Sequence, residues 1–126
     1  MTKRVITTPD APSSPLYSQG VVIGSTIYVS GMVGIDPATK ELPETIQGQT
    51  SQALRNCFAI VEAGGGSRDD IAQVTVLLTN PGDFGGMNQA YAEAFPEAPP
   101  ARAVAKLGVE LPGILVSIMM TAQVGD

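Results

Sequence analysis

The segment spanning residues 99–122 carries the two side chains best suited to chemistry, Arg102 and Ser117. Arg102 stands at the start of an apolar stretch and has no acidic neighbour in sequence. A guanidinium keeps its charge at every relevant pH, and its planar fork of N–H donors matches a carboxylate. Arg102 is therefore a candidate anion clamp, and the alternative is a strand-end arginine held in a structural ion pair. Ser117 interrupts the apolar run 115–120.

Four further residues have types that suit a ligand site: Tyr17, Ser30, Gly31 and Asn88. Asn88 falls inside the apolar stripe of an expected helix, where an amide must find partners, either in a neighbouring loop or in a ligand. Tyr17 follows a Pro/Ser loop, so its ring packs there or its hydroxyl reaches a ligand. Ser30 and Gly31 end an expected strand, where glycine allows close backbone approach; the alternative is an ordinary turn glycine.

Composition narrows the classes of function. The 126 residues are 44% hydrophobic and 15% charged, which predicts one domain over residues 1–126 with some apolar surface covered by another subunit. A net charge of −5, with the seven basic residues spread along the chain, disfavours nucleic acid as a partner. The chain has no histidine, which excludes a Ser/His/Asp triad and most zinc sites.

Localisation can be predicted only from what the sequence lacks. Cys57 is the one cysteine, so no intramolecular disulfide forms, and its place on an apolar helical stripe predicts inert packing. No apolar leader follows Met1, and no apolar run approaches the length of a membrane span. We therefore expect a cytoplasmic protein.

Periodicity and turn residues predict six strands and two helices. Residues 45–63 form an apolar stripe at helical spacing that ends at three glycines, with Gln49 and Gln52 off the stripe. Asp83 is a suitable N-cap for a second helix over residues 84–95. A loop is expected over residues 31–43. The predicted strands span residues 4–7, 21–23, 26–30, 71–79, 101–107 and 115–124.

This order of elements predicts an α+β fold with both helices on one face of a mixed sheet. In the strand over residues 101–107, Arg102, Val104 and Lys106 share one face. The last strand is largely apolar on both faces, yet two helices cover only one face of a sheet. The expected cover for the other face is a second copy of the chain.

Five segments in order resemble motifs of the RidA/YjgF family of reactive imine deaminases, the "endoribonuclease L-PSP" type. Nearly the whole chain is covered. The first two segments, P-L-Y-S-Q-G (residues 15–20) and Y-V-S-G-M-V-G-I-D-P (28–37), resemble the family's G-P-Y-S-Q-A and Y-x-S-G-Q-x-G-x-D-P. The other three are Q-A-L-R-N-C-F-A-I-V-E-A-G-G (52–65), M-N-Q-A-Y-A-E-A-F (87–95) and P-P-A-R-A-V-A (99–105).

The resemblance implies a chorismate-mutase-like fold assembled as a homotrimer with clefts between subunits. Family members bind small 2-oxo or 2-imino acids there and hydrolyse reactive 2-imino acids to 2-oxo acids and ammonia, without metal or cofactor. By matching position, Arg102 would bind the substrate carboxylate, Tyr17 and Asn88 would line the cleft, and Ser30 and Gly31 would supply backbone contacts. The resemblance also implies that Val104 lines the cleft, at a position where the family often has cysteine.

The chain departs from the family where active members place a glutamate that positions or activates water. Fifteen positions after Arg102 stands Ser117, a far weaker base. Glu110, Glu97 or a neighbouring subunit's acid are candidate substitutes. Three hypotheses follow: an imine deaminase whose altered site includes Ser117, a non-catalytic 2-oxo-acid-binding module, and, ranked last, an RNA-cleaving translation inhibitor.

Overall fold

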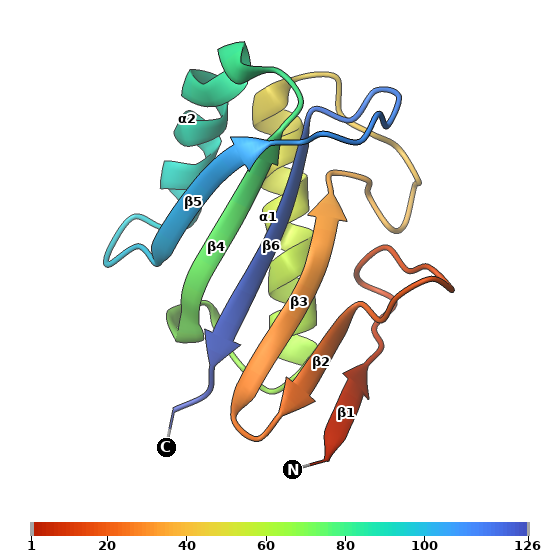
Figure 1. Ribbon diagram of the computed structural model, residues 1–126, viewed down its shortest axis with the longest axis vertical. Coiled ribbons are helices and arrows are strands. Elements are labelled where there is room, and N and C mark those ends of the chain that lie inside the picture. The colour runs from red at the N-terminus through yellow and green to blue at the C-terminus, as the bar shows by residue number, and fades with distance from the viewer. Residues whose placement is uncertain (1, 126) are drawn as a thin grey trace.

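The computed structural model describes residues 2–125 as a single mixed sheet with two α-helices packed on one face (Figure 1). The order of strands in the sheet is β1-β2-β3-β6-β4-β5. Neighbours run antiparallel except β4 and β5, which are parallel. The predicted α+β layout is confirmed. Its elements are β1 (Lys3–Ile6), β2 (Gly20–Ile23), β3 (Thr26–Val33), α1 (Ile46–Ala63), β4 (Ile71–Leu78), α2 (Phe84–Ala94), β5 (Ala101–Lys106) and β6 (Val116–Gln123).

Local chemistry explains where the helices begin. The N-cap of α1 is Thr45, whose hydroxyl accepts a hydrogen bond from the Gly48 N–H at 3.0 Å. The N-cap of α2 is Asp83, as predicted, but its side chain makes no capping bond. A short 3-10 helix (Pro81–Asp83) leads directly into α2 and extends the turn before it.

The core lies between the helices and the sheet face that they cover. Alternate residues of the neighbouring strands β4 and β6 point into it, including Val74, Val76, Val116 and Ile118, all fully buried. From α1, side chains at three- and four-residue spacing meet them, as the apolar stripe predicts. Burial of this surface is the main force that fixes the sheet beneath the helices.

Two expectations about the first half of the chain are wrong in detail. The loop predicted to begin at Gly31 does not begin there, because β3 continues to Val33 through a bulge in its pairing with β6. The polar residues off the α1 stripe also do not all face water: Gln49 and Gln52 are buried, as is Asn56. The Asn56 amide donates to the carbonyls of Val33 and Ile35, so it anchors the end of β3 to the helix.

The other face of the sheet is open, and it faces the reader in Figure 1. It carries Tyr28 and Met119, which are 49% and 46% exposed. These two side chains border a depression of about 410 Å³ together with Gln73, Thr75 and Thr121. Within residues 2–125, no helix is long and apolar enough to cross a bilayer.

Candidate functional site

Arg102 projects from β5 toward α2. Its Cα pairs with that of Val74, so both side chains leave the sheet on the face that the helices cover. The guanidinium Nη1 donates to Oδ1 of Asn88 at 2.7 Å and approaches Sδ of Met87 at 3.9 Å. Asn88 therefore holds the arginine and does not tie down a neighbouring loop.

Aromatic rings line the approach to this arginine. The guanidinium carbon lies 4.8 Å from the ring centroid of Tyr91 and 5.9 Å from that of Phe84, distances typical of cation–π contacts. Burial raises the pKa of Tyr91, and the positive charge of Arg102 opposes that shift. The Tyr91 hydroxyl is buried without a hydrogen-bond partner among the described residues.

The ion-pair alternative for Arg102 is wrong for the part of the chain that the structure describes. No Asp or Glu side chain between residues 2 and 125 lies within ion-pair distance of the guanidinium, whose contacts are a neutral amide, a thioether and aromatic faces. Among residues 2–125 the guanidinium has two hydrogen-bond acceptors, both neutral and both reached by Nη1, so it retains donors for an external anion. We call Arg102, Asn88 and Val104 the arginine half-site.

Val104 follows on the same face of β5, two residues beyond Arg102. Its Cα pairs with that of Val76, and its side chain is partly buried against the core. It borders an apolar pocket of about 420 Å³ that Phe84 also borders. The structure therefore brings three of the predicted residues, Arg102, Asn88 and Val104, to one place.

Ser117 lies on the opposite, open face of the sheet. Its Cα pairs with Val33 of β3, just past the bulge. A Cβ built on Gly31 would come within 3.1 Å of the Ser117 hydroxyl oxygen. This confirms that glycine at position 31 permits a close approach, and the group approached is Ser117.

Ser30 joins this second cluster through hydrogen bonds to the segment that precedes β2. Its hydroxyl donates to the Ser18 carbonyl at 2.5 Å, and its N–H donates to the Gln19 carbonyl at 2.9 Å. Tyr17 directly precedes Ser18 in the chain, and its side chain is 48% exposed. We call Tyr17, Ser30, Gly31 and Ser117 the serine half-site.

Gln19 is a supporting residue that sequence reasoning did not select. It is only 4% exposed, and its amide nitrogen donates to the carbonyls of Thr8, Ala11 and Pro12 at 2.9–3.0 Å. Its amide oxygen accepts from the Thr8 N–H at 2.7 Å. A glutamine between a Pro/Ser loop and a strand was the available signal, because a buried amide must be fully satisfied.

The two half-sites do not meet within one chain. Arg102 leaves the sheet on the helix-covered face of the edge strand β5, whereas Ser117 lies on the open face of β6. Strand β4 separates β5 from β6, and the Tyr17 loop lies beyond β3 on the far side of the sheet (Figure 1). A small ligand therefore cannot touch both half-sites of one chain.

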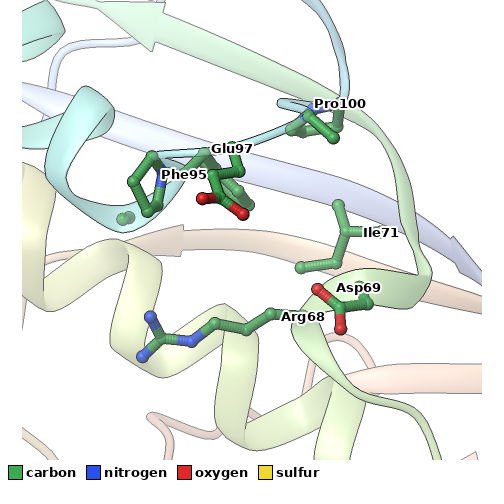
Figure 2. Close-up of a pocket in the computed structure, with 9 residues that line it drawn as sticks. Arg68, Asp69, Ile71, Phe95, Glu97 and Pro100 are labelled. Atoms are coloured by element: carbon green, nitrogen blue, oxygen red, sulfur yellow. The ribbon is translucent and has the colours of Figure 1, made fainter.

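Within residues 2–125, neither Glu110 nor Glu97 makes a hydrogen bond to a residue of either half-site. Glu110 is exposed in the connection between β5 and β6. Glu97 borders a different cavity, of about 440 Å³, at the other end of α2. Figure 2 shows the carboxylates of Glu97 and Asp69 directed into that cavity, which contains none of the predicted site residues.

Other chemistry-bearing groups are limited. Cys57 is fully buried, its thiol donates to the Ile118 carbonyl at 3.3 Å, and burial raises its pKa far above the usual range, as inert packing predicts. Within residues 2–125, no group of three or more His, Cys, Asp or Glu side chains is placed to hold a metal ion.

Comparison with known proteins finds a matching family, related sequences and solved structures of the same fold. The family described as Endoribonuclease L-PSP matches residues 8–124. The mouse 2-iminobutanoate/2-iminopropanoate deaminase is 37% identical over 98% of this chain and 93% of its own. The crystal structure of RidA from an Antarctic Psychrobacter superposes with a TM-score of 0.90 at 37% identity, covering 96% of this chain and 99% of that one. The structure of E. coli TdcF with bound serine superposes with a TM-score of 0.89 at 31% sequence identity, covering 97% of this chain and 99% of that one.

Proposed function

The chain belongs to the endoribonuclease L-PSP family, which includes the RidA and YjgF proteins, and from this premise we propose that it binds small 2-oxo and 2-imino carboxylates and hydrolyses reactive 2-imino acids. The observation that carries the proposal is Arg102: a fixed guanidinium held by Asn88, with no carboxylate partner among the described residues. The deaminase activity named for the mouse relative supports the 2-imino substrate, and the serine bound to TdcF supports a small carboxylate as ligand.

The proposed reaction needs few groups. Arg102 holds the substrate carboxylate through two parallel N–H···O bonds, and backbone groups near Gly31 hydrogen-bond the imine nitrogen. Water adds to the C=N carbon and one of its protons passes to the imine nitrogen. The tetrahedral adduct then passes its hydroxyl proton to the amine and breaks its C–N bond, and ammonia leaves as the C=O bond forms. Ser117 is too weak a base to deprotonate water unaided, so its hydroxyl only orients the water. Positioning then supplies most of the acceleration.

We propose that the working unit is a homotrimer in which each cleft joins the arginine half-site of one subunit to the serine half-site of the next. The two half-sites lie on opposite faces of one chain, so neither can complete the cleft alone. The open sheet face, with Tyr28 and Met119 half exposed, is the surface that the other copies would cover. Sedimentation velocity measures the assembly directly, and a monomer at micromolar concentration would contradict it.

The test of the activity couples the protein to an amino acid oxidase, which generates a 2-imino acid in solution. We expect faster decay of the imine with the protein than in buffer, and no acceleration would rule out the deaminase assignment. An Arg102→Ala variant at the same concentration is the control, because it removes the carboxylate clamp and leaves the rest of the surface unchanged.

A second candidate is a non-catalytic module that binds 2-oxo acids, and the observation that favours it is Ser117 in place of the family glutamate. In that case 2-oxobutanoate binds in calorimetry while imine decay stays at the buffer rate. Binding that survives Arg102→Ala unchanged would contradict the clamp in either candidate. RNA cleavage ranks last, because the chain has net charge −5 and no histidine; RNA left intact by clean protein would remove it.

A further inference from the structure

We propose that the apolar pocket beside Arg102 takes the side chain of the bound acid, so that the preferred ligands are 2-oxo or 2-imino acids with apolar side chains longer than two carbons. This inference rests on the proposed function, because it assigns the remainder of the same ligand. The pocket encloses about 420 Å³, within the range of small-molecule sites. Its lining residues are Leu78, Pro81, Phe84, Val104, Ala105 and Lys106.

The pocket and the clamp share a wall. Phe84 borders the pocket and also lies 5.9 Å from the guanidinium carbon of Arg102. Val104 borders the pocket two residues beyond Arg102 on the same face of β5, about 7 Å further along the strand. A carboxylate held by Arg102 would therefore direct its substituent along the strand and into the pocket.

The chemistry of the lining selects an apolar substituent. Five of the six lining residues present only carbon side chains, and Phe84 is 47% exposed. Lys106 is the exception and stands at the end away from Arg102, because it is the last residue of β5. Its aliphatic stem can line the wall while its ammonium group stays in water. A second carboxylate on the ligand is the competing occupant.

Calorimetry on the assembled protein separates these cases with four probes: pyruvate, 2-oxobutanoate, 4-methyl-2-oxopentanoate and the dicarboxylate 2-oxohexanedioate. We expect the dissociation constant to fall about fourfold for each added apolar carbon. 4-Methyl-2-oxopentanoate has three more carbons than pyruvate, so between these two acids the dissociation constant falls about 60-fold by the same rule. A dicarboxylate that binds more tightly than 4-methyl-2-oxopentanoate overturns the assignment and makes Lys106 a second anion contact.

Two substitutions locate the effect. Val104→Thr preserves the shape of the side chain but places a hydroxyl in the pocket. We therefore expect the ratio of the dissociation constants of pyruvate and 4-methyl-2-oxopentanoate to fall from about 60 to roughly ten. The matched control is Val5→Thr, the same change on an exposed strand at the other edge of the sheet, where the ratio stays unchanged. Val104→Phe fills the pocket and is expected to bring the ratio close to one.

The outcomes distinguish this inference from the function beneath it. If no 2-oxo acid binds in a manner that depends on Arg102, both fail. If all probes bind equally and Arg102→Ala abolishes binding, the proposed function stands and the pocket assignment falls. If Val104→Phe disrupts the trimer while Val104→Thr leaves the ratio unchanged, a neighbouring subunit fills the pocket, and the assignment is again overturned.

Discussion

The arginine half-site and the serine half-site are built by different means. Around Arg102, side chains do the work: an amide oxygen at 2.7 Å and an aromatic face at 4.8 Å fix a permanent charge. Around Ser117, the backbone determines the geometry, through a bulge in β3, a glycine at position 31 and hydrogen bonds that hold the Ser30 segment in place. In the reaction proposed above, ligand binding and the orientation of water would thus depend on separate parts of the fold, so one could change while the other is retained.

Removal of the charge is the largest perturbation that this comparison predicts. In Arg102→Ala, a bound 2-oxobutanoate loses two charge-assisted hydrogen bonds, together about 4 kcal/mol, or about 1,000-fold in the dissociation constant. Calorimetry measures the loss. Arg55→Ala, which removes an exposed arginine from α1, is the control and leaves the affinity unchanged. Equal losses in both variants would mean that net charge, not the clamp, binds the acid.

Restoring an acid to the serine half-site tests the other side of the comparison. Ser117→Glu places a carboxylate beside Gly31, where the missing Cβ leaves room, and a positioned base typically contributes at least 100-fold to the rate. We expect imine decay to accelerate by about that factor with little change in 2-oxobutanoate affinity. Ser117→Gln has similar size without the charge and provides the control. A Gln variant as fast as the Glu variant would refute base catalysis at this position.

Asn88→Asp places a carboxylate next to the Arg102 guanidinium, so the arginine half-site would contain its own ion pair. The new carboxylate competes with the ligand for the guanidinium, and we expect affinity for 2-oxobutanoate to fall about tenfold. Gln89→Glu, the same charge change one residue along the helix, controls for the general field. Calorimetry that finds Asn88→Asp as tight as the unmodified protein would show that Asn88 does not orient the clamp.

The core between the half-sites provides the smallest predicted effect, and one that alters neither half-site. The Cys57 thiol is buried and its pKa in the folded state lies above the ordinary 9.0. Above about pH 9 the unfolded chain therefore binds fewer protons than the folded chain, and the free energy of unfolding falls by about 1.4 kcal/mol per pH unit.

Urea titrations between pH 7 and pH 10.5 in the presence of reductant measure this slope. Cys57→Ala has no thiol at position 57, so the part of the slope that depends on this residue disappears. If both proteins lose stability equally with pH, the thiol does not titrate as its burial predicts. Binding of 2-oxobutanoate at pH 7 should be the same in both.

Local rules predict much of this molecule from its sequence. Apolar alternation gave the strands to within about two residues for β4 and β6, and Thr45 and the triple glycine bounded α1, because these signals depend on near neighbours. The continuation of β3 past Gly31 was not predictable, since it depends on pairing with β6 some 85 residues away. Burial of Gln49 and Asn56 likewise depends on carbonyls distant in sequence, those of Gly113 and of Val33 at the end of β3.

The site was less predictable than the elements. Residue types and motif spacing selected Arg102, Asn88 and Val104, and the structure brings these three together. Residue types and spacing do not predict that Ser117 and Arg102 leave the sheet on opposite faces, because that depends on the order of strands β6, β4 and β5. They also did not reveal Gln19, whose role exists only once the loop folds over it.

Gln19 has a consequence for how quickly a ligand can bind. Its four hydrogen bonds hold the loop over residues 8–12 against the start of β2, so contacts within the chain fix the segment before Tyr17. The conformational entropy of that segment is lost on folding and is not lost again on binding. Association should then follow a single fast phase whose rate rises linearly with ligand concentration, without the plateau that a slow loop closure would impose. In Gln19→Ala the loop is released, and such a plateau is expected to emerge.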